Sequence, residues 1–189
     1  VPVPSWHRAP GLAELLAARV EAALAWIDGT ARRRTAVFFT AHSLPERAVA
    51  GDDPYPAQVA ESAADVAGLL GLDAVAGVTW QVAWQSAGRT DDAWLGPDLL
   101  TEIRRVADEG ATAVVVCPVG FVSDHLEILY DLDVEARKLA DSLGVAFTRT
   151  RSLNDDPRFL GVLAGEVRGA AGKDAPGDAP TAAPPAPRA

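Results

Sequence analysis

Residues 113–135 read AVVVCPVGFVSDHLEILYDLDVE, and this stretch decides the fold. The apolar run of residues 113–121 predicts a buried strand that ends in a glycine turn. A helix follows the turn, and Ser123 or Asp124 stands where it could cap that helix. A strand that leads directly into a helix is typical of α/β proteins with a parallel sheet.

Three carboxylates stand four residues apart on the predicted helix, at Glu127, Asp131 and Glu135. In an α-helix this spacing places them on one face, where each pair of like charges costs roughly 0.2–0.5 kcal/mol. A bound cation would offset the repulsion. Because open α/β sheets place their sites at the carboxyl ends of the strands, the row predicts a metal path that starts there.

A solvated acidic face is the alternative interpretation of the same row. The helix macrodipole favours acidic residues near a helix N-terminus. Asp133 could also pair with Arg137, and Glu135 with Lys138, which would relieve part of the repulsion.

A second motif, residues 38–45, reads FFTAHSLP. The short apolar segment 36–40 predicts a buried strand, and Pro45 excludes an immediate helix. His42 is therefore expected at the carboxyl end of a central strand, as Glu127 is. A structural, hydrogen-bonded histidine is the alternative; an imidazole that faces a carboxylate suits Fe, Zn or Co, whereas an all-oxygen site suits Mg or Ca.

Three motifs together carry a family resemblance. They are residues 41–45 (AHSLP), residues 84–86 (WQS) with 94–97 (WLGP), and residues 118–127 (PVGFVSDHLE). In residue type, order and spacing they resemble the ferrochelatases of haem synthesis, and the resemblance extends from about residue 10 to residue 159.

The resemblance implies insertion of ferrous iron into a porphyrin by a two-lobed enzyme with a chelatase fold. The family's histidine, which acts in metal binding and proton abstraction, falls on His42, and the glutamate that faces it falls on Glu127. The family's acidic helix track falls on Asp131 and Glu135. How His42 and Glu127 divide the roles of metal ligand and proton acceptor stays open.

Aromatic and polar residues follow the second strand. Trp84 and Trp94 could form a wall for a flat apolar ligand or belong to the core, and the resemblance favours a place in the cleft for Trp94. Gln85 and Ser86 are assigned to the substrate side, where they could brace the loop. No Gly-x-Ser-x-Gly turn surrounds Ser43, which argues against a nucleophile.

Composition excludes several function classes. The 189 residues are 49% hydrophobic, which suffices for a packed domain. The net charge of −9 argues against a nucleic-acid partner or an anionic membrane surface. Residues 91–141 contain 12 acidic and 4 basic side chains, so the charge is concentrated where the site is predicted.

Cys117 is the single cysteine, and it lies inside an apolar strand. It is expected to be a buried small hydrophobe, and a disulfide within the chain is excluded, which fits the cytoplasm. One cysteine cannot hold the iron–sulfur cluster that some bacterial ferrochelatases carry. No apolar run approaches 18 residues, so no integral membrane segment is expected.

Helices and strands alternate along the chain. Helices are expected at 11–27, 57–70, 97–109, 124–143 and 156–169, and strands at 35–41, 74–84, 111–118 and 145–148. The pattern predicts an α/β domain, a chelatase-type Rossmann-like lobe with a four-stranded parallel sheet and helices on both faces. Residues 170–189, with 5 prolines in the last 14 positions, predict a disordered tail.

The chain is expected to be a fragment, because it starts at Val1 and contains no methionine. Residues 1–169 would form the second, catalytic lobe, and the missing N-terminal lobe would be its partner. Two lysines against 15 arginines suggest a GC-rich Gram-positive source, for which coproporphyrin III is favoured over protoporphyrin IX. The alternatives are a cobalt or nickel chelatase for another tetrapyrrole, and an isolated lobe that binds metal or tetrapyrrole without turnover.

Overall fold

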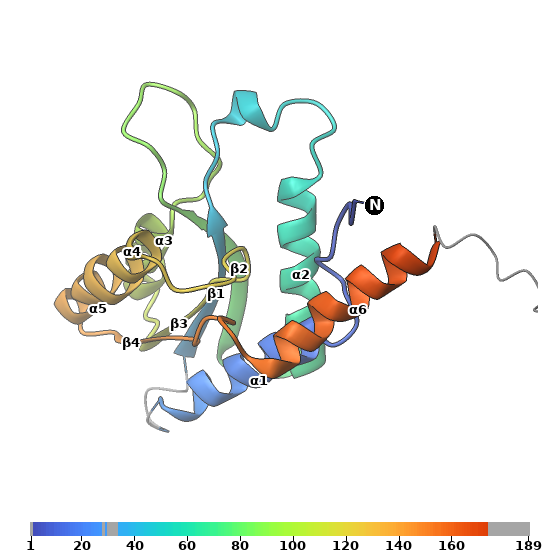
Figure 1. Cartoon of the computed structure of the whole chain (residues 1–189). Helices are drawn as coiled ribbons and strands as arrows, with labels where there is room; N and C mark the ends of the chain where they lie inside the picture. The colour runs from blue at the N-terminus through green and yellow to red at the C-terminus, as the bar shows by residue number, and fades with distance from the viewer. Residues whose placement is uncertain (1, 28, 30–33, 174–189) are drawn as a thin grey trace, which may run out of the picture.

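A computed structural model describes residues 2–27, 29 and 34–173 (Figure 1). It contains the strands β1 (Thr35–His42), β2 (Val78–Gln85), β3 (Ala113–Cys117) and β4 (Ala146–Arg149). The helices are α1 (Leu12–Ala25), α2 (Tyr55–Leu70), α3 (Leu99–Asp108), α4 (Leu126–Leu129), α5 (Arg137–Leu143) and α6 (Pro157–Lys173). A π-helical segment, η4 (Tyr130–Ala136), joins α4 to α5.

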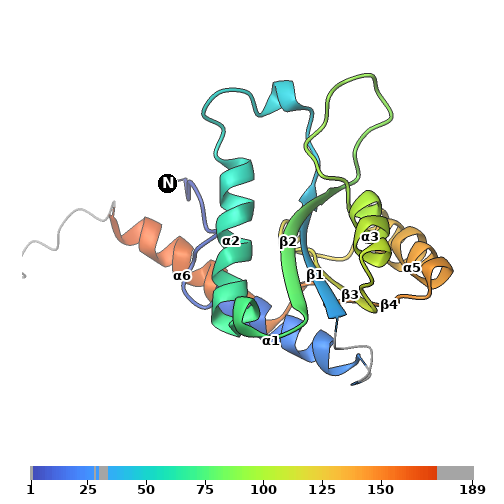
Figure 2. The ribbon, with the colours of Figure 1, turned by 180° about the vertical axis from the view of Figure 1, so that it is seen from behind.

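All four strands are parallel, in the order β2-β1-β3-β4. The sheet lies between two helical layers, and β2 forms the edge nearest the viewer in Figure 2. His42, the last residue of β1, stands opposite Gln85, the last residue of β2. The predicted α/β class, with a four-stranded parallel sheet and helices on both faces, is confirmed.

Each face of the sheet has its own core because side chains alternate along a strand. Val37 and Phe39 pack towards α1, α2 and α6. Ala36 and Phe38 point the other way, towards α3 and the helical run 126–143. The strand β1 is thus buried on both faces, which explains its continuous apolar sequence.

Two predicted boundaries are wrong for local reasons. The second strand begins at Val78 instead of residue 74, because Gly71 turns left-handed at φ 59° and a 3₁₀ turn at Leu72–Ala74 follows it. Pro97 does not lie in the first turn of α3. The Asp98 carboxylate accepts a hydrogen bond of 2.9 Å from the Thr101 amide and caps the helix. The helix therefore begins at Leu99, the residue after this cap.

The ends of the third strand and of the last helix also differ from prediction. The strand β3 spans 113–117 instead of 111–118, and α6 continues to Lys173 instead of ending at residue 169. Residues 170–173 are thus helical, and the rest of the predicted tail, 174–189, lies outside the described residues.

The acidic helix differs from prediction in its start and in its winding. His125 is the residue at its N-cap, with no side-chain cap bond, so neither Ser123 nor Asp124 caps it. Its middle, Tyr130–Ala136, is π-helical instead of α-helical. Such wide turns are rare in proteins, and those that do occur are often part of a functional site.

Cys117 is fully buried, as predicted. Burial raises the pKa of its thiol to about 12, so the thiolate, which is the nucleophilic form, is disfavoured. Among the residues that the structure describes, no helix is both long and apolar enough to cross a membrane.

Candidate active site

The carboxyl end of β1 fixes the position of His42. Its Nδ1 contacts the backbone carbonyl of Ser43, and its own carbonyl accepts a hydrogen bond of 2.9 Å from the Tyr55 hydroxyl. A carbonyl oxygen can only accept, so Nδ1 carries the proton. In the neutral form of the ring, the lone pair is therefore on Nε2.

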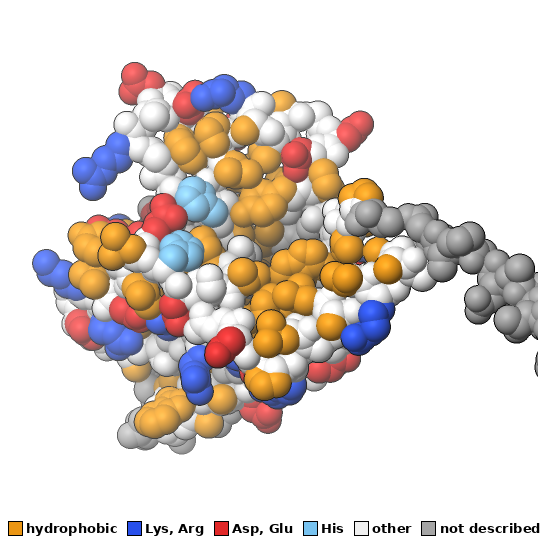
Figure 3. All heavy atoms as spheres, viewed as in Figure 1, with side chains coloured by type: hydrophobic (Ala, Val, Ile, Leu, Met, Phe, Trp, Pro, Cys, Tyr) orange, Lys and Arg blue, Asp and Glu red, His pale blue; other side chains and the backbone are white. Residues whose placement is uncertain are grey.

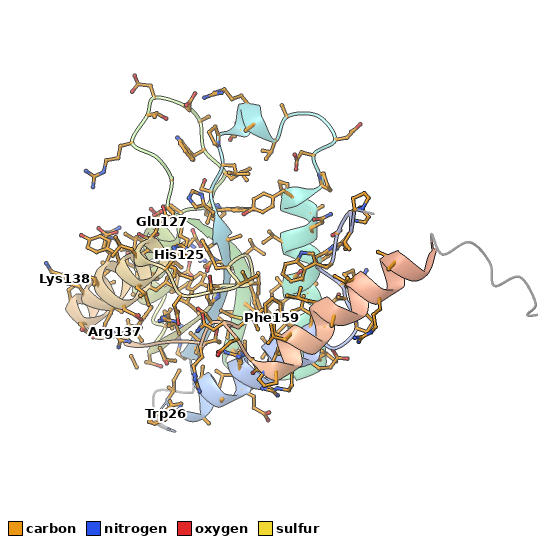
Figure 4. All side chains as sticks on the ribbon, viewed as in Figure 1. Trp26, His125, Glu127, Arg137, Lys138 and Phe159 are labelled. Atoms are coloured by element: carbon orange, nitrogen blue, oxygen red, sulfur yellow. The ribbon has the colours of Figure 1, made fainter. Side chains whose placement is uncertain are left out.

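His42 Nε2 points at Glu127, and the distance to its Oε1 is 3.4 Å. The two side chains are 36% and 49% exposed, so a ligand can reach both. Glu127 lies in the first turn of α4, beside His125 (Figure 4). The structure thus brings together the two residues on which the predicted site depends.

Phe121 and His125 complete this edge of the sheet, and neither was predicted from the sequence as a site residue. The Phe121 ring contacts two imidazoles, with ring centroids 6.3 Å from His42 and 5.6 Å from His125. The position of His125 two residues before Glu127 was the signal that could have identified it. The loop after β3 brings it to the site.

Asp131 is held by the end of β2. Its Oδ2 accepts a hydrogen bond from the Ser86 hydroxyl and a longer one, 3.4 Å, from the Gln85 amide. Ser86 adopts a left-handed backbone with φ 61°, which is uncommon for a residue other than glycine. Gln85 is buried, and its Oε1 has no hydrogen-bond partner among the described residues.

Glu135 lines the same cavity as Glu127 and Asp131, on the α3 side of the sheet. The cavity measures about 390 Å³, and its charged lining consists of four carboxylates, the fourth from Asp98, and the exposed Arg89. Within the described part of the chain, no three His, Cys, Asp or Glu side chains stand close enough to hold one ion together. The described carboxylates of the cavity therefore do not form a closed cage for one ion.

The ion pairs predicted along the acidic helix do not form. Asp133 pairs with Arg149 of β4 through two bonds of 2.8 Å instead of with Arg137. Arg137 instead lies over the Phe147 ring, at 5.2 Å. Glu135 and Lys138 form no ion pair in the described structure. Asp133 thus pairs with a residue on the neighbouring strand β4 instead of with the residue four positions later on its own helix.

Asp124 fastens the loop before α4 to the segment after β4. Its carboxylate accepts hydrogen bonds from Asn154 at 2.9 Å and Ser152 at 2.7 Å, and it pairs with Arg149 at 3.3 Å. The Asn154 and Ser152 bonds and the Arg149 charge hold the pKa of Asp124 below its usual value. This contact replaces the capping role that the sequence predicted for Asp124.

The two tryptophans occupy different places. Trp84 is buried and lies 5.6 Å from the Tyr55 ring, so it belongs to the core. Trp94 is half-buried; its ring lies against Gly88, and its Nε1 donates to Thr90 at 3.2 Å. Trp94 does not line the acidic cavity, which is the cavity that contains Asp98, Glu127, Asp131 and Glu135.

Hydrophobic side chains form a band across the face seen in Figure 3, beside the two histidine side chains visible there. An apolar cavity of about 280 Å³ lies on the α2 side of the loop after β3, with Trp6, Tyr55 and Val119 in its wall. Glu127 thus lines the acidic cavity, and the apolar cavity includes Tyr55, whose hydroxyl donates to the His42 carbonyl.

Comparison with known proteins places these features in one family. The family model described as Ferrochelatase matches residues 2–171. A ferrochelatase of Herpetosiphon aurantiacus is 43% identical over 165 residues, which are 87% of this chain and 52% of that protein. A coproporphyrin III ferrochelatase of Geobacillus sp. is 39% identical over 163 residues, 86% of this chain and 51% of that protein.

The chain spans about half the length of the curated relatives it matches. Among solved structures, a CbiX protein of cobalamin (vitamin B12) biosynthesis from Marinobacter aquaeolei VT8 aligns with a TM-score of 0.48 and 15% identity. That alignment covers 74% of this chain and 99% of the other.

Proposed function

The chain belongs to the ferrochelatase family, and from this premise we propose that it is the catalytic, C-terminal lobe of an enzyme that inserts ferrous iron into a porphyrin for haem. The observation that carries the proposal is the accessible His42–Glu127 pair, 3.4 Å apart at the carboxyl edge of the sheet. This edge is where open α/β sheets bind their ligands.

Porphyrin metalation requires the loss of two pyrrole N–H protons. His42 is the candidate base, because the Ser43 carbonyl holds its Nδ1 proton and leaves Nε2 free to accept a proton or ligate iron. Glu127 can take the complementary role beside it. A positioned base contributes typically about 10²–10⁴-fold to the rate.

The acidic cavity supports a route for the iron substrate. Asp131 and Glu135 line it together with Glu127, and Ser86 and Gln85 hold Asp131 in place. Separate carboxylates bind a cation weakly enough to release it to the porphyrin, whereas a closed cage would retain it. Fe²⁺ accepts both imidazole and carboxylate ligands.

Coproporphyrin III is the proposed substrate, ahead of protoporphyrin IX. Five of the curated relatives, 37–40% identical to the chain, bear the name coproporphyrin III ferrochelatase. The apolar surface beside His42 suits one face of a flat macrocycle. Because the site is open and the chain covers half of its relatives, a second lobe is proposed to close over the porphyrin.

Anaerobic Fe²⁺ insertion, followed by absorbance, tests the proposal. The chain is assayed alone and with the unmatched part of the Herpetosiphon relative supplied as a second polypeptide. Coproporphyrin III and protoporphyrin IX are compared, with Co²⁺ and Ni²⁺ as competing metals. We expect turnover with both polypeptides and faster turnover with coproporphyrin III.

Preference for Co²⁺ or Ni²⁺ would overturn the assignment of the metal. Folded protein that binds a porphyrin but turns over neither substrate, even with the second polypeptide, would identify a binding lobe instead of an enzyme.

A further inference from the structure

A third cavity, of about 340 Å³, lies between α1 and the segment that includes the end of β4 and the residues after it. It shares no lining residue with the acidic cavity. Its charged lining consists of four arginines and one carboxylate, Arg19, Arg149, Arg151, Arg158 and Asp156. On a chain with net charge −9, such a concentration of guanidinium groups requires an explanation.

The carboxylates nearby neutralise these arginines only in part. Arg149 is matched by Asp133 and Asp124, which lie outside the cavity. Arg19 and Arg158 share the single carboxylate of Asp156, at 2.8 Å and 3.2 Å.

Arg151 has an exposed guanidinium that makes no hydrogen bond or ion pair with any residue the structure describes. Nε of Arg19 is buried, and it too has no partner in the described structure. Counting Asp124 and Asp133, four arginines thus stand against three carboxylates, and the unpaired Arg151 carries the excess positive charge. Because a cleft concentrates the field of the charges that line it, the cavity attracts anions.

Trp26 adds a flat apolar surface to the cavity. It follows the last residue of α1, its side chain is 86% exposed, and it lines the cavity beside Ala22 and Ala23. Figure 4 shows it at the end of the helix, away from Glu127 and His125. An exposed indole is an effective partner for another planar ring, because stacking removes apolar area from water.

We propose that this cavity binds a small organic anion, a single planar ring system that bears a phosphate or a carboxylate. Guanidinium groups recognise both oxyanions through their N–H donors. Arg151 supplies a paired set here, and Arg158 supplies Nη1, the nitrogen that does not bond Asp156. Trp26 stacks on the ring. The volume lies at the lower end of the roughly 300–1,000 Å³ of ligand pockets, so the cavity fits one ring system and not a tetrapyrrole.

Calorimetric titration of the whole chain with three probes tests the proposal. The probes are AMP, benzene-1,2-dicarboxylate and inorganic phosphate. The site variant is Arg151→Gln with Arg158→Gln, and its control is Arg104→Gln with Arg168→Gln, which removes two exposed charges elsewhere. Trp26→Ala tests the ring contact.

We expect saturable binding of AMP, of the dicarboxylate, or of both. The site variant should bind at least about tenfold more weakly, because it loses charge-assisted hydrogen bonds to the oxyanion, and the control variant should bind as the unmodified chain does. Trp26→Ala should weaken the two ring-bearing probes and leave phosphate unchanged. Tighter binding of AMP would identify a phosphate ligand, and tighter binding of the dicarboxylate a carboxylate ligand.

The proposal is wrong if no probe binds saturably, or if the site and control variants bind equally. If AMP and benzene-1,2-dicarboxylate bind no more tightly than inorganic phosphate, the proposed planar ring of the ligand is wrong.

Discussion

At the scale of single residues, the chemistry depends on which nitrogen of His42 carries the proton. The Ser43 carbonyl fixes that proton on Nδ1, and the Tyr55 hydroxyl anchors the backbone of the same residue. Nε2 is thereby directed at Glu127 without any rearrangement. Such a contact to the distal ring nitrogen orients a histidine as a base or as a metal ligand.

His42→Ala should abolish iron insertion, with a loss of about 10²–10⁴-fold or more, because the base and a metal ligand are removed together. Lys138→Ala is the control, since Lys138 is exposed on α5 and lines none of the three cavities described above. Insertion rates are measured with the second polypeptide present, and circular dichroism checks the fold. Unchanged turnover in His42→Ala would contradict the assigned role.

Asp131→Ala should slow iron delivery more than it weakens porphyrin binding. Its carboxylate is the one that Ser86 and Gln85 hold towards the cavity. We expect the apparent KM for Fe²⁺ to rise several-fold, while the porphyrin Kd, measured by fluorescence quenching, stays constant. Asp141→Ala, an exposed carboxylate on α5, is the control. A weaker porphyrin affinity with an unchanged iron KM would show that the acidic row has been misinterpreted.

At the scale of elements, the loop after β3 must approach β1 closely to bring Phe121 and Glu127 to His42. Gly120 donates its N–H to the Thr40 carbonyl at 3.0 Å. A Cβ at residue 120 would lie 2.5 Å from the Ala41 Cβ and 2.9 Å from its Cα. Glycine is therefore required by close packing of two backbones.

Gly120→Ala should destabilise the fold by about 1–3 kcal/mol, the usual cost of overpacking, and should lower insertion activity by moving the loop away from His42. Gly68→Ala is the contrasting variant: residue 68 is exposed on α2 with open space around it, so alanine should stabilise the helix by about 0.5–1 kcal/mol. Urea unfolding followed by tryptophan fluorescence gives both values. Equal stability of Gly120→Ala and the unmodified chain would show that the close approach is dispensable.

The π-helical turn decides which carboxylates face the cavity. It keeps Asp131 and Glu135 in the cavity lining and directs Asp133 towards Arg149 of β4. One element thus joins the acidic cavity to the far edge of the sheet. The apolar residues Leu132 and Ala136 of the same segment stay buried, so the wider turn does not disrupt the core.

At the scale of the whole molecule, two carboxylates fasten the segment after β4 to the rest of the fold. Hydrogen bonds from Arg158 and Arg19 lower the pKa of Asp156 to about 2. Asn154, Ser152 and Arg149 lower the pKa of Asp124. Both groups have a higher pKa in the unfolded chain, about 3.9. They therefore stabilise the fold above about pH 4, and this contribution is lost as the pH falls through the folded-state pKa values.

Asp124→Asn should lower the free energy of unfolding at pH 7, and its difference from the unmodified chain should shrink as the pH falls from 4 towards 2. The reason is that the unfolded chain takes up its protons first when the pH falls. Urea unfolding at pH steps between 7 and 2 measures the difference. Asp141→Asn, which removes an exposed carboxylate, should show no such trend. A difference that is constant across this range would contradict the linkage.

Local pattern alone determined the elements and the edge of the sheet where the site lies. The apolar runs 36–40 and 113–121 predicted buried strands, which β1 and β3 confirm, and parallel strands place their following residues at one edge. His42 and Glu127 were therefore expected together from sequence, and they are. The buried thiol of Cys117 followed in the same way, because an apolar strand determines the burial of all its residues.

Contacts between distant segments decided the rest. The partner of Asp133 is Arg149, 16 residues away across the sheet edge, and a rule based on helix spacing cannot anticipate it. The π turn, the place of His125 beside Phe121 and the role of Asp124 also depend on packing between segments. The cavity lined by four arginines lies where α1 meets the chain after β4, which follows about 130 residues later in the sequence. Helix and strand periodicity describe neighbours within an element, whereas these features arise where separate elements meet, which only the tertiary structure fixes.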